Sequence, residues 1–173
     1  ILKNHNVDHT FIYNGGAIMP IIDGLYRHNI PYYVNSNEFC VGSSAVGYAK
    51  ASGKTGVAVV TSGPGLTNII TSITDATNDS TPLVVLSGQV PVNALGTDAF
   101  QECPATELTK SVTKWNYCVK NTNEFPYVLE TAFRIANEGR KGAVHIDIPK
   151  CVGNGIFEYD IKNCNKLKTR FNW

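Results

Sequence analysis

Along the first 150 residues, apolar runs of strand length alternate with segments in which apolar residues recur at helical spacing. The run at 82–87 is apolar almost throughout, as expected of a parallel strand that is covered on both faces. Between the runs, helical spacing is clearest at Leu66, Ile69, Ile70 and Ile73. This alternation predicts an α/β fold with an open, mostly parallel sheet of about six strands and helices on both faces. The strands are expected at 9–13, 31–34, 56–61, 82–87, 115–119 and 143–148.

The same pattern sets the expected domain limits. A long loop is expected from Gly88 to about Gln101, followed by a short helix after Pro104. A later helix should end at Gly139, because glycine favours the conformation that terminates helices. Beyond the last strand the chain becomes polar and rich in asparagine. We therefore expect one domain over residues 1–152, with residues 153–173 forming a linker or the start of a further domain.

Composition excludes several classes of protein. The chain has 15 basic and 14 acidic residues without a basic stripe, which argues against a nucleic-acid partner. An apolar content of 43% is too high for a disordered chain, and no apolar run approaches the roughly 20 residues that span a membrane. The five cysteines form no C-x-x-C pair and no zinc-ligand spacing with histidine. We expect reduced thiols, no metal site in this chain, and an intracellular location, cytoplasmic or organellar, with any targeting segment not visible.

Candidate chemistry lies in four strand-to-helix turns, because ligands of open parallel sheets bind beyond the carboxyl ends of the strands. The turns are 13–16, 35–38, 61–65 and 88–101. Two are rich in glycine, which lets a flat ligand approach the backbone, and Glu38 is the carboxylate between them. Taken alone, Gly63–Gly65 could be only a tight turn, because Asn68 stands where the dinucleotide fingerprint has its third glycine. Glu38 could likewise be only an acidic residue near a helix N-terminus.

A set of motifs in a fixed order favours the functional interpretation of these residues. It resembles the catalytic (large) subunit of acetolactate synthase, also called acetohydroxyacid synthase, a family of thiamine-diphosphate-dependent enzymes. The resemblance covers roughly residues 1–152 and is to the N-terminal, pyrimidine-binding domain of that family. The motifs that carry it are GGAIMP at 15–20, GYA at 47–49, TSGPGLTN at 61–68, SGQVP at 87–91, GTDAFQE at 96–102, TKWN at 113–116 and DIPK at 147–150.

The resemblance implies an activity and its requirements. The family decarboxylates pyruvate and condenses the product with a second 2-oxo acid, in branched-chain amino-acid biosynthesis. Its cofactors are thiamine diphosphate, magnesium and FAD, and the thiamine diphosphate lies between two subunits of a homodimer; a regulatory subunit is possible. The diphosphate domain of the family carries a G-D-G sequence, which does not occur here. Magnesium and FAD would therefore be held by other domains, and the chain alone is expected to be inactive.

The resemblance also implies roles for individual residues. The carboxylate of Glu38 would hydrogen-bond N1′ of the cofactor's pyrimidine ring and favour its imino tautomer, and Gln101 would be the second catalytic residue. Phe100 would lie near the substrate. The cofactor-binding set is Tyr13, Asn14, Gly15, Gly16, Glu38, Thr61, Pro64 and Asn68. Positions near the substrate, or where herbicides of the family bind, are Ala17, Pro91, Ala99 and Phe100.

The chain also departs from the family pattern. Asn14 replaces a proline, Asn37 replaces a histidine, and residues 39–46 differ from the family's usual segment. These changes leave the role of Glu38 intact and leave the choice of substrate open. Two alternatives therefore stand beside the synthase: a related 2-oxo-acid decarboxylase or carboligase, and a non-catalytic paralogue that binds a partner subunit.

Overall fold

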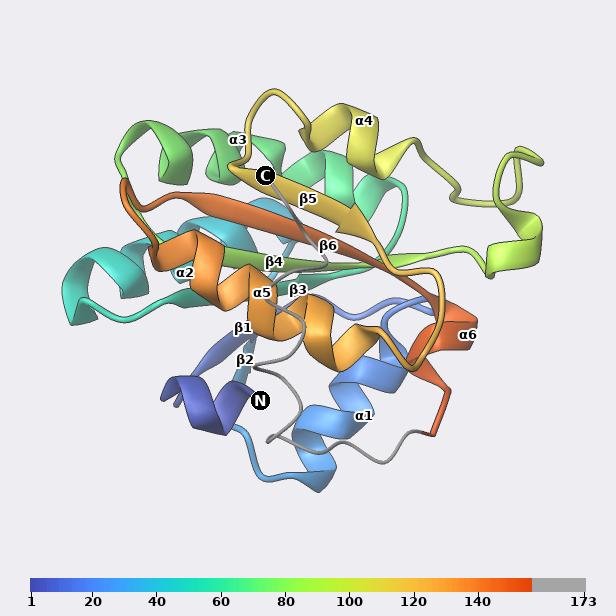
Figure 1. Cartoon of the computed structure of the whole chain (residues 1–173), viewed down its shortest axis with the longest axis horizontal. Coiled ribbons are helices and arrows are strands. Elements are labelled where there is room, and N and C mark those ends of the chain that lie inside the picture. Colours follow the sequence, from blue (N-terminus) through green and yellow to red (C-terminus); the bar gives the residue numbers. More distant parts are fainter. Residues whose placement is uncertain (157–173) are drawn as a thin grey trace.

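The computed structural model describes residues 1–156. Its sheet has six strands, all paired in parallel, in the order β2-β1-β3-β4-β6-β5 (Figure 1). The predicted α/β fold is confirmed, and each strand boundary agrees with the prediction to within two residues. The strands are β1 (Thr10–Ile12), β2 (Tyr32–Val34), β3 (Gly56–Val60), β4 (Leu83–Gln89), β5 (Trp115–Cys118) and β6 (Ala143–Pro149).

Helices cover both faces of the sheet, as predicted (Figure 1). On one face lie α1 (Met19–Arg27), α5 (Phe125–Asn137) and α6 (Lys150–Gly153); on the other lie α2 (Glu38–Ser52), α3 (Pro64–Asn78) and α4 (Ala105–Thr109). Two short 3-10 helices, η1 (Leu2–His5) and η2 (Val92–Ala94), complete the described elements. No helix within residues 1–156 has the length and apolar character that crossing a bilayer requires.

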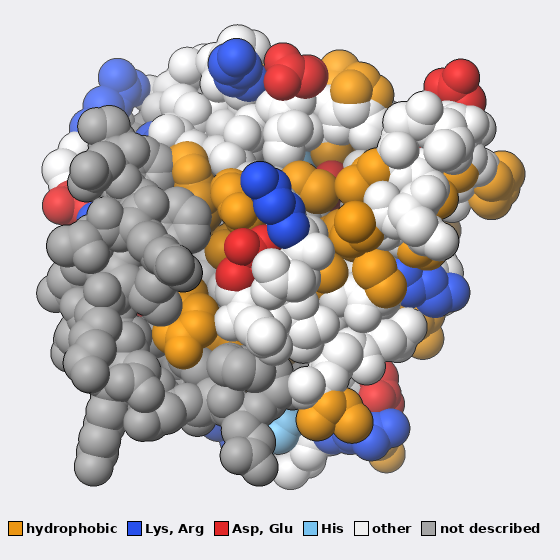
Figure 2. Space-filling view, turned by 45° about the vertical axis from the view of Figure 1, so that its right-hand side comes forward, with side chains coloured by type: hydrophobic (Ala, Val, Ile, Leu, Met, Phe, Trp, Pro, Cys, Tyr) orange, Lys and Arg blue, Asp and Glu red, His pale blue; other side chains and the backbone are white. Residues whose placement is uncertain are grey.

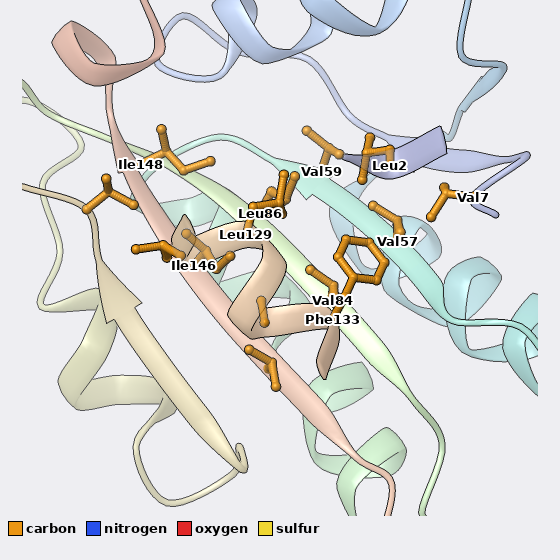
Figure 3. Close-up of a cluster of buried hydrophobic side chains, with 14 of the residues drawn as sticks. Leu2, Val7, Val57, Val59, Val84, Leu86, Leu129, Phe133, Ile146 and Ile148 are labelled. Carbon is orange, nitrogen blue, oxygen red and sulfur yellow. The ribbon is translucent and has the colours of Figure 1, made fainter. Parts of the chain in front are cut away.

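The central strands supply side chains to two separate cores. In β3, Val57 and Val59 point to the α1/α5 face, whereas Ala58 and Val60 point to the α2/α3 face. Figure 3 shows the first of these cores, in which Phe133 of α5 lies over the sheet. Successive residues of a strand face opposite sides, so a strand buried on both sides is apolar at most positions, and any polar side chain in it needs a buried partner. This requirement is why the continuous apolar runs predicted the central strands well.

The strand order gives the sheet a topological switch point. β1 pairs with β2 on one side and with β3 on the other. After β1, the chain forms β2 on one side of β1 and then crosses to form β3 on the other side. The carboxyl ends of β1 and β3 are therefore a topological switch point. Ligands of open α/β sheets bind in the crevice at such a point. The turns that carry Gly15 and Gly63 begin there.

The structure differs from the predictions at the start of the chain, where η1 was not expected, in the loop after β4 and at the end of the domain. β4 continues to Gln89, and the loop after it contains η2. Val152 is only 3% exposed and packs in the α1/α5 core, within α6. The proposed domain boundary after residue 152 stays a prediction, since residues 157–173 of the expected linker lie outside the described part of the chain.

Candidate functional site

The turns after β1 and β3 approach each other closely at the crevice. A Cβ atom at Gly15 would lie 2.4 Å from Cβ of Thr61, and a Cβ atom at Gly65 would lie 2.8 Å from Cγ2 of Thr61. Glycine is therefore required at both positions for this packing. The hydroxyl oxygen of Thr61 is buried between them and has no hydrogen-bond partner among the described residues. A buried hydroxyl without a partner is costly, so this atom is a candidate ligand contact.

Glu38 begins α2 beside the same crevice. Asn37 caps the helix by accepting a hydrogen bond from the backbone amide of Cys40 at 2.9 Å. Asn68 Nδ2 of α3 donates to Glu38 Oε2 at 3.2 Å, and Oε1 lies 3.6 Å from the position a Cβ would take at Gly65. An acidic residue that only complements a helix end is normally exposed, but Glu38 is 8% exposed. Its burial against α3 favours the functional interpretation.

The loop after β4 closes a third side of the site. The backbone of Gln101 lies against the Gly63 turn, because a Cβ at Gly63 would come within 2.7 Å of the Gln101 carbonyl oxygen. Gly63 also has a φ of +57°, which favours glycine. At the base of the loop, Ala17 lies next to Gly88, where an added Cβ would be 2.8 Å from Cβ of Ala17. The turns after β1, β3 and β4 therefore meet at one edge of the sheet.

The other predicted site residues lie at the rim or farther out. Asn14, Gly16 and Pro64 are exposed, and Tyr13 is partly buried against the α2/α3 core. On the loop, Pro91 is exposed and Ala99 partly buried, and Phe100 is 88% exposed. Figure 2 brings this side of the molecule forward, and hydrophobic side chains gather there. The structure therefore brings Gly15, Glu38, Thr61, Asn68 and Gln101 together and leaves Pro91 and Phe100 on the outer loop.

A cavity of about 550 Å³ lies elsewhere, between α1, α5 and the N-terminal segment, and is lined largely by apolar side chains such as Pro20, Leu25 and Phe125. Of the described residues that line it, none is a predicted site residue. We place the site at the crevice because the buried carboxylate and the glycine contacts lie there. A crevice open to solvent on one side need not enclose a volume.

A buried polar network lies beneath the loop, and sequence reasoning missed it as a unit. Ser87 Oγ donates to Asp147 Oδ1 at 2.6 Å and lies 2.7 Å from His145 Nε2. Gln89 Nε2 donates to Asp147 Oδ2 at 2.8 Å and to the carbonyl of Cys103 at 3.1 Å. Polar residues at alternate positions inside two apolar strands are the sequence signal that could have found it. Ser87 is fully buried and bridges the histidine and the carboxylate, so the group is not a hydrolase triad.

Burial changes both ionisable groups of this network. It lowers the pKa of His145 from 6.5 to about 3, and it raises the pKa of Asp147 from 3.8 to about 6, against the hydrogen bonds from Ser87 and Gln89. His145 is therefore a neutral imidazole at pH 7. Its second ring nitrogen, Nδ1, lies 2.9 Å from Oγ1 of Thr109.

We predict that His145 stays uncharged in the folded chain well below pH 6.5. Because its folded pKa lies below the unfolded value, its contribution to stability is complete above pH 6.5 and is lost as the pH falls from 6.5 towards 3. The raised pKa of Asp147 has the opposite sign: it favours folding as the pH falls from about 6 to 3.8, so the two effects partly cancel. Nitrogen NMR of the ring should show a neutral tautomer from about pH 7 to about pH 4.5.

A ring titration with a midpoint near the ordinary histidine value of 6.5 would contradict this prediction. As a second readout, the free energy of unfolding is compared between the wild type and His145→Gln. Their difference should shift in favour of the wild type as the pH rises from about 4.5 to about 7, because only the wild type carries the histidine's linkage. A difference that does not change with pH would count against the proposed burial effect.

Within residues 1–156, no group of three or more His, Cys, Asp or Glu side chains is placed to hold a metal ion. The four cysteines of that part are free thiols: Cys40, Cys103, Cys118 and Cys151. What the crevice offers is a buried carboxylate, an unpaired hydroxyl and glycine-lined backbone. These groups suit a flat heteroaromatic ring with a polar edge that turns towards Glu38.

Comparison with known proteins points the same way. Residues 1–108 match the family model described as "Thiamine pyrophosphate enzyme, N-terminal TPP binding domain". The chain is 45% identical over 162 residues to the mitochondrial acetolactate synthase catalytic subunit of Saccharomyces cerevisiae, covering 93% of this chain and 24% of that protein. It is 44% identical over 149 residues to the acetolactate synthase isozyme 2 large subunit of Escherichia coli, covering 86% and 27%. The chain thus spans about a quarter of the length of these relatives.

Proposed function

The chain belongs to the thiamine pyrophosphate enzyme family, as its N-terminal TPP binding domain, and on that basis we propose that it forms the pyrimidine half of an acetolactate synthase active site. The observation that carries the proposal is the burial of Glu38 at the switch-point crevice, hydrogen-bonded to Asn68 and facing Gly65. Relatives named acetolactate synthase, 44–45% identical over 86–93% of the chain, support the choice of reaction.

The residues present fit the pyrimidine ring of thiamine diphosphate. The carboxylate of Glu38 would accept a hydrogen bond from N1′ of the ring, while Asn68 holds its other oxygen in place. The buried hydroxyl of Thr61 has no hydrogen-bond partner among the described residues, and the missing side chains of Gly15 and Gly65 make room for Thr61 at this position. Tyr13, Asn14, Gly16 and Pro64 would complete the binding surface. When bound, the cofactor supplies the carbanion chemistry, and the protein supplies orientation and electrostatics.

The catalytic contribution of this chain would be to polarise the ring. A carboxylate that is nearly excluded from water interacts more strongly with a bound ring than an exposed one would, because few water molecules screen it. Glu38 would thereby favour the imino tautomer of the ring, in which the exocyclic nitrogen can act as a base. The substrate side would be formed by Ala17, Ala99, Phe100 and Gln101, with Pro91 at its rim.

The proposed assembly rests on exposed apolar side chains and on the names of the relatives. Exposed Met19, Phe39, Val92 and Phe100 lie in the segments that follow β1, β2 and β4, and exposed Val34 is the last residue of β2, so they lie on the carboxyl-end side of the sheet. Such a patch favours a partner that covers it, which we propose is a second subunit of a homodimer carrying the diphosphate and magnesium ligands. FAD would likewise bind outside this chain. Relatives are named "large subunit", which supports a smaller regulatory partner, and three are named mitochondrial. We propose an intracellular location.

The departures from the family pattern leave the fold of this region intact. Within residues 39–46, Val41, Ala45 and Val46 are buried in the α2/α3 core, and Ser43 Oγ lies 3.3 Å from Ser72 Oγ. The altered segment therefore forms the helix that carries Glu38. The departures bear on substrate choice, which the following experiment tests.

The experiment is an assay of the complete reading frame that contains this sequence, purified and supplied with thiamine diphosphate, Mg²⁺ and pyruvate. We expect acetolactate, with the cofactor required for its formation. Carbon dioxide and acetaldehyde without acetolactate would replace the synthase by a decarboxylase. Absence of both products, together with no binding of thiamine diphosphate by calorimetry, would favour the non-catalytic paralogue.

A further inference from the structure

The loop between β4 and α4 is organised around one carboxylate. The side chain of Glu102 accepts a hydrogen bond from the backbone amide of Gly96 through Oε1 and from that of Ala99 through Oε2, the latter at 3.1 Å. The backbone amide of Glu102 in turn donates to the carbonyl of Ala99 at 2.8 Å. The segment from Gly96 to Glu102 is thus closed on itself by one side chain.

The charge of Glu102 is what this arrangement requires. Hydrogen bonds from backbone amides, chiefly that of Gly96, hold the pKa of its carboxyl below the ordinary value. The ionised carboxylate accepts such bonds more strongly than a neutral group does. The carboxylate therefore acts as the fixed centre of the loop.

The enclosed segment adopts a conformation that ordinary side chains disfavour. Asp98 has a φ of +57° and Gln101 a φ of +61°, although neither is glycine. Non-glycine residues in the left-handed region persist where surrounding contacts determine them. In this loop, the hydrogen bonds to Glu102 and the packing of the Gln101 backbone on the Gly63 turn are such contacts.

The base of the loop is fixed independently. Gln89 Nε2 holds the carbonyl of Cys103 at 3.1 Å and is itself hydrogen-bonded to the buried carboxylate of Asp147. Loss of the Glu102 charge should therefore loosen residues 96–101 and leave β4, β6 and the end of the loop in place.

We propose that Glu102 is a positioning residue, which holds residues 96–101 in the one conformation that places Gln101 against the Gly63 turn. The role in catalysis rests on the proposed function, because Phe100 and Gln101 are assigned there to the substrate side. The hydrogen bonds of the Glu102 carboxylate are to backbone amides of the loop and not to the crevice residues. It acts through the backbone of the loop.

The first test uses this chain and needs no activity. Hydrogen exchange at the amides of Gly96 and Ala99 is measured in the wild type, in Glu102→Gln and in Glu107→Gln, a control at an exposed glutamate of α4. We expect exchange at both amides to be at least about tenfold faster in Glu102→Gln and unchanged in the control, with equal melting temperatures. Equal exchange rates in Glu102→Gln and the wild type would overturn the inference.

The second test uses the complete enzyme. We expect Glu102→Gln to raise KM for the 2-oxo acid about tenfold, with a smaller fall in kcat, while exchange of the cofactor's C2 proton stays at the wild-type rate. Wild-type KM and kcat in a variant whose loop amides exchange faster would overturn the positioning role. If the wild-type enzyme forms no acetolactate, the proposed function fails, and the amide exchange still decides whether Glu102 organises the loop.

Discussion

Glu38→Gln is expected to remove nearly all acetolactate formation by the complete enzyme while leaving the fold intact. Glutamine has the same size and can still accept the hydrogen bond from Asn68, but it carries no charge to polarise the pyrimidine ring. If the carboxylate contributes a charge-assisted hydrogen bond mainly in the activated state, the loss is on the order of 3 kcal/mol, or roughly a hundredfold in rate. Steady-state assays and thermal melting of the same preparations measure both effects.

Glu107→Gln is the matched control for this variant. Glu107 is also an acidic residue in the first turn of a helix, but it is exposed. An acid that only complements a helix end contributes about 0.3–1 kcal/mol to stability and nothing to turnover. If Glu38→Gln behaves like this control, with lower stability and full activity, Glu38 has no catalytic role.

Phe133→Ala is expected to cost the chain about 3–5 kcal/mol of stability, which is the usual range for removing a large aromatic side chain from a core. Phe133 is 1% exposed in the α1/α5 core (Figure 3), and its ring stacks on His5 with centroids 4.5 Å apart. His5 Nε2 is also hydrogen-bonded to Glu130 Oε2 at 2.6 Å, so removal of the Phe133 ring leaves the His5–Glu130 pair less well packed. Urea unfolding monitored by circular dichroism gives the free energy.

Phe100→Ala removes the same atoms from a side chain that is 88% exposed. Its effect on the free energy of unfolding should stay within about 0.5 kcal/mol. Equal losses in Phe133→Ala and Phe100→Ala would mean that the α1/α5 core is not packed as described.

The strands could be predicted from the sequence because burial on both faces leaves a local mark. Residues 143–148 are apolar except at His145 and Asp147, and the strand there ends one residue later than predicted. The strand order could not be predicted in this way, since periodicity reports which face a residue buries and not which strand lies beside it. The crevice between β1 and β3 depends on that order, and so the structure was needed to find it.

The sequence likewise predicts only part of the candidate site. The glycine turns and Glu38 were identified from motifs, but their contacts join residues far apart in the chain, such as Glu38 with Asn68 and Gly15 with Thr61. Ser87 and Asp147 belong to the SGQVP and DIPK motifs, and only the pairing of β4 with β6 places them opposite each other. Glu102 acts on backbone amides a few residues away, and the left-handed conformations that make this possible carry no composition signal at Asp98 or Gln101.

The most direct test of the account is exchange of the C2 proton of thiamine diphosphate bound to the complete enzyme, followed by NMR after rapid quenching in deuterated water. This measurement reports activation of the cofactor before any substrate binds, so substrate choice does not affect it. We predict that Glu38→Gln slows the exchange roughly a hundredfold at an unchanged melting temperature, and that Glu107→Gln exchanges at the wild-type rate. Wild-type exchange in Glu38→Gln would contradict the claim that this chain supplies the activating carboxylate of a thiamine site.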